Sequence, residues 1–295
     1  MTRKTYTLEL ITPCFCAGAN PAQAEIRAPS IRGQLRWWFR ALGGSSVEES
    51  EVFGSAAGDD GIGSSLRIAI ADFKRGPLWT PPKIDQNSAQ NYTWHFASVS
   101  GKAANAGRSA LGPRWQTNGA LPPGSIFKLH ITQSRSIKPE LLIKLNFAVD
   151  AFLCFGSLGL RATRGLGAFR CVEARPWREL LEPLSVAGFT TALRQDPDVF
   201  TSWESALRDW SAWLRYQFRE PKNGGVKAKS YSALGGIEPR QTSAVRFRPI
   251  KLGENQFTWI AIEAPHDRVL GKKTPTILTP SILTGPAPTA PPRLQ

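Results

Sequence analysis

Arginines at a helical spacing are the residues of this chain best suited to chemistry with an anion. Residues 31–42 predict a helix, and three arginines in it stand four residues apart, so they share one face. No acidic residue interrupts the group, and a serine placed to cap the helix start leaves backbone amides that favour a phosphate. The alternative is a solvated basic face whose arginines pair with carboxylates elsewhere. This first cluster consists of Arg27, Ser30, Arg32, Gly33, Arg36 and Arg40.

An adjacent stripe of the same helix is apolar and predicts the face that packs on a sheet. The stripe consists of Leu35, Trp38, Phe39 and Leu42. Trp37 points away from it, so we expect Trp37 to be exposed. An exposed Trp at this position could stack on a nucleotide base or pack on a neighbouring subunit, and the sequence leaves both open.

A second cluster combines glycines with cations in the turn at residues 156–167. Glycine permits positive φ and lets another chain approach the backbone, while the arginines supply charge. Open amides beside cations suit a phosphate, although a tight helix-to-strand turn would use the same residues. The turn lacks the Lys-Ser/Thr ending of a P-loop and the strand-before-helix context of a dinucleotide-binding motif. Its candidate residues are Gly159, Arg161, Thr163, Arg164, Gly165 and Gly167.

A third cluster of basic residues lies in the second half of the chain, at Arg240, Arg246 and Arg248. Alternation along a predicted strand would put Arg246 and Arg248 on one face. That pattern is equally compatible with RNA contact and with a plain basic sheet face. A preceding loop adds three lysines, which are Lys222, Lys227 and Lys229.

Signals for catalysis are weak. The histidines are His95, His130 and His266, and none stands in a zinc-protease, serine-hydrolase or deaminase pattern. His130 lies in an alternating segment, which is typical of a structural histidine. Asp59 and Asp60 could hold a metal, but their Gly-rich surroundings favour a turn. We therefore expect no catalytic residue, no metal and no cofactor.

Composition points to a polyanionic partner. The 295 residues carry 37 Lys and Arg against 23 Asp and Glu, a net charge of +14 with an isoelectric point near 10.1. Basic side chains release counterions when they meet phosphates, so this balance favours nucleic acid. The four cysteines form no disulfide or metal pattern, and no apolar run is long enough for a membrane span. We expect a cytoplasmic protein with no membrane partner.

The order of predicted elements indicates an α+β fold. We expect two ferredoxin-like, RRM-related domains with inserted loops, of which the second is smaller and degenerate. The predicted division is 1–176 and 177–273, followed by a Pro-rich tail at 274–295. In the first part, strands are expected at 5–11, 64–73, 91–99, 125–133 and 168–173, and helices at 31–42 and 139–155. In the second part, helical structure is expected after residue 183, with one helix at 199–218, and strands at 243–252 and 256–264.

Several of these segments resemble the RAMP superfamily of CRISPR proteins. They are the run PSIRGQLRWWFRAL at 29–42, the motif VFGS at 52–55, the glycine turn at 159–167, and the TP-x-F-x-x-G loop that begins at Thr12. The resemblance is closest to the first subunits of type III-B effector complexes. It is strong over residues 5–173 and loose at 239–249.

The resemblance implies an RNA-binding subunit of a multi-subunit complex with CRISPR RNA and other RAMP subunits. It places the subunit away from the large polymerase-like subunit, near the guide 3′ end and its duplex with target RNA. It also implies a non-catalytic role in antiviral defence. RAMP subunits that cut target RNA use an Asp between the first strand and first helix, and residues 12–29 contain Asn20 and Glu25 but no Asp.

Two other functions remain open from the sequence. One is a metal-independent RAMP endoribonuclease that processes CRISPR RNA with His95 or His130 as general base. The other is an interaction module whose basic face meets an acidic protein.

Overall fold

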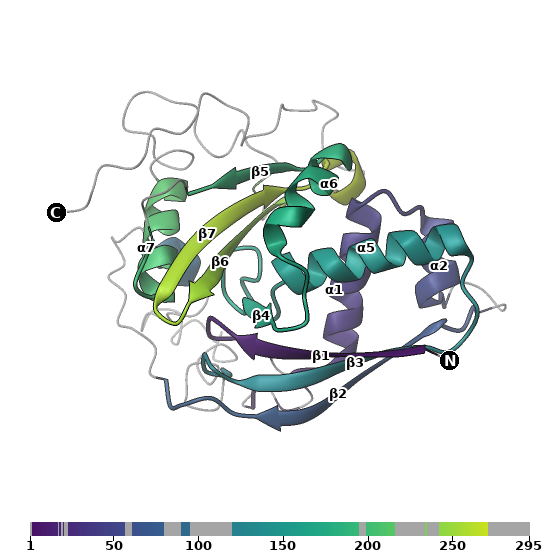
Figure 1. Ribbon diagram of the computed structural model, residues 1–295, viewed down its shortest axis with the longest axis horizontal. Coiled ribbons are helices and arrows are strands. Elements are labelled where there is room, and N and C mark those ends of the chain that lie inside the picture. The colour runs from purple at the N-terminus through teal and green to yellow at the C-terminus, as the bar shows by residue number, and fades with distance from the viewer. Residues whose placement is uncertain are drawn as a thin grey trace, which may run out of the picture.

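The computed structural model describes residues 2–16, 18, 20, 23–56, 61–79, 90–94, 120–194, 199–215, 234 and 242–270. They form two antiparallel sheets with helices packed around them (Figure 1). The first sheet lies at the bottom of that view with its helices above it, and the second lies at the upper left. Several predicted features lie outside the described residues, namely Asp59, Asp60, His95, Lys222, Lys227, Lys229, Arg240 and the tail at 274–295.

The first sheet contains β1 (Thr2–Leu10), β2 (Leu66–Lys74), β3 (Ile126–Gln133) and β4 (Phe169–Cys171). The strand order is β2-β3-β1-β4 and every pairing is antiparallel. Tyr6, Leu8 and Leu10 alternate with less buried residues, so β1 turns one face inward. The predicted split βαβ order of elements is confirmed for this sheet.

Three helices accompany the first sheet: α1 (Ala28–Ala41), α2 (Ser46–Phe53) and α5 (Pro139–Phe155). α1 buries Leu35, Trp38 and Phe39 of its predicted apolar stripe, together with Ile31. α5 has the predicted bounds. α2 was not predicted, although Ser45 and Glu48 form a capping box that marks its start.

The second sheet has three described strands in the order β5-β7-β6. They are β5 (Thr190–Leu193), β6 (Val245–Gly253) and β7 (Gln256–Glu263). α7 (Trp203–Leu214) packs on them through Trp210, which stacks on Phe247. The two predicted strands and the predicted helix are confirmed, whereas β5 lies in a stretch expected to be helical.

Four short elements complete the described chain: α3 (Asn91–Trp94), a 3₁₀ turn η2 (Trp177–Leu180), α6 (Leu181–Val186) and α8 (His266–Val269). The strand expected at 91–99 is wrong at its start, because Asn91–Trp94 form a helical turn. The amide of Trp94 donates to the Gln90 carbonyl at 3.1 Å. Its ring packs against Phe15 and Trp79, so tertiary packing overrides the β propensity of the segment.

One hydrophobic core is continuous across the predicted division at residue 176. It contains Leu10 and Phe152 from the first part and Ile250 and Ile260 from the second. The division into two domains stays a prediction. No helix among the described residues has the length and apolar character needed to cross a membrane.

Candidate nucleic-acid interface

The structure connects the described residues of the three basic clusters that the sequence predicts. β6 joins the glycine turn, because the Phe247 amide donates to the Thr163 carbonyl at 3.2 Å. From β6 the Arg246 side chain reaches α1, where it donates to Gln34 Oε1 at 2.9 Å. The glycine turn also binds the loop after β1, since the Leu160 amide donates to the Phe15 carbonyl at 2.8 Å.

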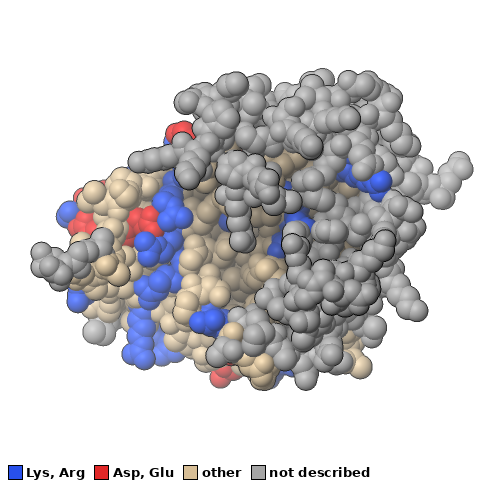
Figure 2. Space-filling view, turned by 180° about the vertical axis from the view of Figure 1, so that it is seen from behind, with Lys and Arg blue, Asp and Glu red and all other residues tan. Residues whose placement is uncertain are grey.

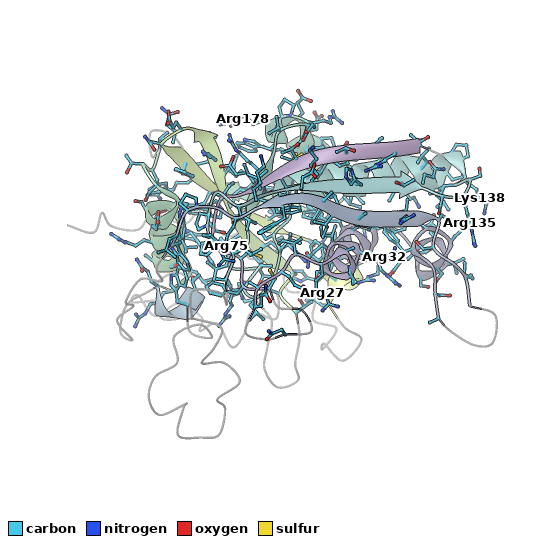
Figure 3. All side chains as sticks on the ribbon, turned by 90° about the horizontal axis from the view of Figure 1, so that it is seen from below. Arg27, Arg32, Arg75, Arg135, Lys138 and Arg178 are labelled. Carbon is cyan, nitrogen blue, oxygen red and sulfur yellow. The ribbon has the colours of Figure 1, made fainter. Side chains whose placement is uncertain are left out.

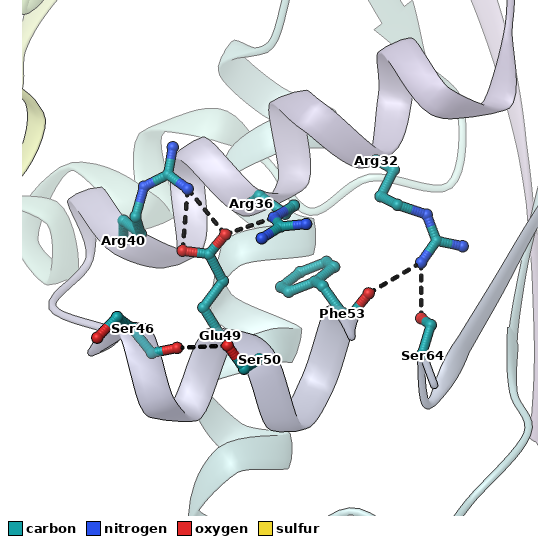
Figure 4. A network of polar contacts seen from close by, with 8 residues as sticks. All are labelled: Arg32, Arg36, Arg40, Ser46, Glu49, Ser50, Phe53 and Ser64. Atoms are coloured by element: carbon teal, nitrogen blue, oxygen red, sulfur yellow. Dashed lines mark hydrogen bonds and ion pairs between the residues drawn. The ribbon is translucent and has the colours of Figure 1, made fainter. Parts of the chain in front are cut away.

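The arginines of α1 have an internal carboxylate partner, which the sequence did not reveal (Figure 4). Glu49, on α2 and only 4 % exposed, accepts a hydrogen bond from Arg36. Both of its carboxylate oxygens also accept from Arg40 Nη1, at 2.8 and 2.9 Å. The expectation of an uncompensated stripe is therefore wrong for Arg36 and Arg40. The capping box folds α2 immediately after α1, and this brings Glu49 under the stripe.

Arg32 holds neutral oxygens rather than a carboxylate. Its guanidinium donates to the Phe53 carbonyl at 3.3 Å, to Ser64 Oγ at 2.6 Å and to the Leu66 carbonyl at 3.0 Å. These bonds tie α1 to the end of α2 and to the start of β2, and Figure 4 shows those to Phe53 and Ser64. They use donors on Nη1 and Nη2 of Arg32 without cancelling its charge.

A net positive charge remains on this face of α1. Arg36 and Arg40 share the one carboxylate of Glu49, and Arg32 binds only neutral oxygens, so the three arginines leave an excess of two positive charges. The Arg36 and Arg40 side chains are 36 % and 43 % exposed. Figure 2 shows a band of Lys and Arg side chains that runs along the position of α1, with acidic side chains at its margin.

The start of α1 is open to solvent and carries no acidic residue in its first turn. The helix begins at Ala28 with Arg27 as N-cap and no side-chain cap, so the expectation that Ser30 caps the helix is wrong. Ser30 and Gly33 are exposed, and a Cβ added at Gly33 would meet nothing within 4 Å. Arg27 is 45 % exposed and lies 3.6 Å from a Glu25 oxygen.

Trp37 is buried, contrary to the expectation of an exposed ring. It is 8 % exposed and packs edge-on against Trp38, with ring centroids 5.0 Å apart. The Arg246 guanidinium covers its other side, 3.5 Å from the ring centroid. Arg246 of β6, more than 200 residues further along the chain, supplies the cover that the helical pattern could not show.

The glycine turn packs mostly against its own chain. Gly165 and Gly167 are buried at positive φ, and a Cβ at Gly167 would overlap the Leu158 carbonyl. Arg164 is also buried and donates to the Leu234 carbonyl at 2.7 Å and to Ser243 Oγ at 3.2 Å. The close approach that these glycines permit is thus intramolecular.

Part of the glycine turn does reach the surface. Gly159 is exposed with a φ of 78°, whereas Thr163 and Arg161 are half-buried. Arg161 has a φ of 59°, a left-handed conformation that a non-glycine residue adopts at some cost in free energy. These three residues are the portion of the second cluster that a ligand could approach.

The predicted alternation of Arg246 and Arg248 is confirmed, but their common face is interior. Arg246 is 6 % exposed, and burial lowers its pKa to about 9. Arg248 is buried as well, donates to the Cys154 carbonyl at the end of α5, and has its pKa lowered to about 10 by burial. We assign both arginines a structural role between the second sheet and the helices.

The described histidines are held by structural contacts. His130 Nδ1 lies 2.9 Å from Thr5 Oγ1, and burial lowers the pKa of His130. His266 Nε2 lies 2.7 Å from Glu263 Oε1. Among the described residues, no group of three or more His, Cys, Asp and Glu side chains is arranged to hold a metal ion.

A family model described as the RAMP superfamily matches residues 7–170, which is more than half of the chain. The chain belongs to the RAMP superfamily. The matched span of this RAMP protein runs from β1 into β4 and includes α1, α2 and the glycine turn. It ends before the second sheet.

Individual relatives agree with this assignment. The RAMP protein is 32 % identical over 201 residues to the CRISPR system Cmr subunit Cmr1-1 of Pyrococcus furiosus, covering 63 % of this chain and 48 % of the relative. It therefore spans about half the length of that relative. The apo crystal structure of Cmr1 from Pyrococcus furiosus matches with a TM-score of 0.53 and 20 % identity over 96 % of this chain and 92 % of that one.

A further structural match concerns a chain of the type III-B Cmr-beta complex bound to cognate target RNA and AMPPnP in the presence of ssDNA. It has a TM-score of 0.50 and 13 % identity over 90 % of this chain and 94 % of that one. At these identities the two structures support the fold of the RAMP protein alone.

Sequence reasoning missed two residues of the interface, Glu49 and Gln34. The pattern Ser45-x-x-Glu48 is a capping-box signature in the sequence, so a helix at 46–53 could have been predicted. That helix would have placed a carboxylate close to α1. Gln34 has no such signal, because its partner Arg246 is distant in the sequence.

Proposed function

We propose that this RAMP protein is a non-catalytic RNA-binding subunit of a type III CRISPR effector ribonucleoprotein. The observation that carries the proposal is the outer face of α1, where three arginines face a single carboxylate, Glu49, beside an open helix start. Guanidinium groups and helix-start amides both favour phosphate, so this face suits an RNA backbone. Base recognition has no candidate here, since Trp37 is buried.

The similar proteins support the proposal. The first curated relative is named a subunit of the CRISPR Cmr system, and one structural match is described as a type III-B complex bound to cognate target RNA. By this similarity we propose CRISPR RNA, target RNA and other RAMP subunits as partners, with contact near the guide 3′ end. We also propose that the second sheet with α7 is a degenerate ferredoxin-like domain.

The test removes two exposed positive charges and leaves Glu49 with one arginine partner. In Arg27→Gln/Arg40→Gln, Arg36 remains to pair with Glu49. For single-stranded RNA, the slope of log affinity against log salt should fall in magnitude by about 1.4, since each lost phosphate contact contributes about 0.7. Filter binding across a salt series gives the slope, and gel analysis should show the RNA intact.

The matched control is Arg175→Gln/Arg178→Gln, which removes the same charge elsewhere. Arg175 pairs with carboxylates of its own region, and Arg178 lies on the opposite side of the molecule from Arg27 and Arg32 (Figure 3). The control should keep the slope of the unmodified protein. Equal slopes for all three proteins would refute the α1 interface, and cleaved RNA would refute the non-catalytic role.

A further inference from the structure

The first sheet has one face that the described helices leave uncovered. In Figure 1 the helices lie above the sheet, and Figure 3 looks at the molecule from the uncovered side. Alternation puts Thr5, Ala69 and His130 in one row in the middle of this open face, where they are small or polar. Such a surface suits a polar ligand better than an apolar one.

Some cations on the open face pair with a carboxylate and others do not. Lys128 pairs with Asp72 at 2.6 Å, and Arg170 pairs with Glu9. Arg3 and Arg67 are exposed, and neither pairs with a carboxylate within the part of the chain that the structure describes. The end of the sheet near Arg3 and Arg67 therefore carries excess positive charge, whereas the end near β4 is neutralised.

Arg3 and Arg67 lie in the same row of the sheet. Arg3 pairs in register with Thr132 on β3, and Thr132 pairs in turn with Arg67 on β2. All three side chains project from the open face, because their strand neighbours Leu66 and Ile131 are buried on the other side. The Cα atoms of Arg3 and Arg67 are two strand spacings apart, about 10 Å. Their long side chains can therefore bind one phosphate or two successive phosphates.

The row is connected to the α1 interface around the edge of the sheet. Arg32 of α1 donates to the Leu66 carbonyl at 3.0 Å, directly before Arg67 on the edge strand β2. Arg135 follows β3 and donates to the Gly63 carbonyl at 3.3 Å. Arg32 and Arg135 lie toward the same end of the molecule in Figure 3, and the basic band in Figure 2 continues to the lower margin.

We propose that the row Arg3–Thr132–Arg67 is a second phosphate-binding site, which takes up the RNA backbone after it passes around β2 from α1. This inference rests on the proposed RNA-binding function and extends it to a second surface. Thr132 can donate a hydroxyl hydrogen bond to a phosphate oxygen between the two guanidinium groups. The paired cations of the face, Lys128 and Arg170, take no part.

The test compares RNA of two lengths on Arg3→Gln/Arg67→Gln. With single strands of about 20 nucleotides, the magnitude of the salt slope should fall by about 1.4, as for two lost phosphate contacts. With strands of about 5 nucleotides, which the α1 face alone can hold, affinity should not change. Both substitutions are at exposed positions, so the melting temperature should match that of the unmodified protein.

The outcomes separate this inference from the function on which it rests. Arg175→Gln/Arg178→Gln is again the control for charge, and Arg27→Gln/Arg40→Gln reports on α1. If the α1 variant weakens binding and Arg3→Gln/Arg67→Gln does not, the second site is refuted and the function stands. If the unmodified protein shows no salt-dependent RNA binding, the second site and the proposed function are both refuted. Loss of subunit assembly with unchanged RNA binding would identify a protein-docking face and also refute the second site.

Discussion

Arg246 brings a charge into the interior without a carboxylate partner among the described residues. Its pKa of about 9 still leaves it protonated at neutral pH. The face of the Trp37 ring and the Gln34 oxygen take the place of an acid. Such an arrangement keeps the second sheet and α1 in one geometry, but it carries a desolvation cost that a well-packed apolar side chain would avoid.

Substitution of Arg246 separates its packing from its charge. Arg246→Met keeps the contact with Trp37, so the free energy of unfolding should stay the same or rise. Arg246→Ala leaves a cavity and should lower that free energy by about 2–4 kcal/mol. Urea unfolding followed by tryptophan fluorescence measures both. A Met variant as unstable as the Ala variant would show that the charge itself stabilises the fold.

Gly33 and Gly167 predict opposite responses to the same substitution. Gly33 is an exposed residue of α1, and a methyl group added there would meet no other atom. Gly33→Ala should therefore raise the free energy of unfolding by about 0.5–1 kcal/mol. Gly167 has positive φ and no room, so Gly167→Ala should destabilise. Thermal melting distinguishes the two. If the RNA backbone lies against α1, Gly33→Ala should weaken RNA binding while it stabilises the protein, a combination that a purely structural glycine would not give.

At the scale of elements, α2 determines how much of the α1 charge is available. Its capping box orients Glu49 toward α1 and Glu48 toward α5, where Glu48 accepts from Lys144 Nζ at 2.6 Å. One short helix therefore connects two longer ones through two adjacent carboxylates. The position of α2 also gives Arg36 and Arg40 a common acceptor in Glu49.

The link between α2 and α5 predicts a specific dependence of stability on pH. The hydrogen bond from Lys144 holds the pKa of Glu48 at about 2, below the ordinary value of 4.5. Because the folded-state pKa is depressed, the stabilisation is complete above about pH 4.5 and is lost as pH falls toward 2. Glu48→Gln should flatten the fall in melting temperature across this window. The exposed Glu140, substituted in the same way, is the control and should leave the profile unchanged.

At the scale of the whole molecule, local patterns predicted the first sheet and α5 well. Alternation located β1, β2 and β3, and Pro139 with Gly156 marked the two ends of α5. The order of these elements was sufficient for the split βαβ arrangement. The RAMP family was recognisable from α1 and the glycine turn, which lie inside the span that the family model matches.

The site was predicted less completely, because its environment comes from distant parts of the chain. The positions of Arg32, Arg36 and Arg40 on one helix face followed from spacing, but their acceptors Glu49, Ser64 and Leu66 did not. Trp37 was expected to be exposed because a helical wheel cannot show that Arg246 covers it. Burial of Arg164 and Arg246 likewise required knowledge of how the second sheet docks.

The bond from Arg248 to the Cys154 carbonyl has a consequence for the order of events during translation. Cys154 lies in the last turn of α5, and the donor that completes this turn is encoded 94 residues later. When α5 leaves the ribosome, the Cys154 carbonyl faces water, and the helix end can fray. Only after β6 has been synthesised does the nascent chain contain the guanidinium that closes this end. The span that the family model matches thus receives a donor for the end of α5 from the part that the model does not match.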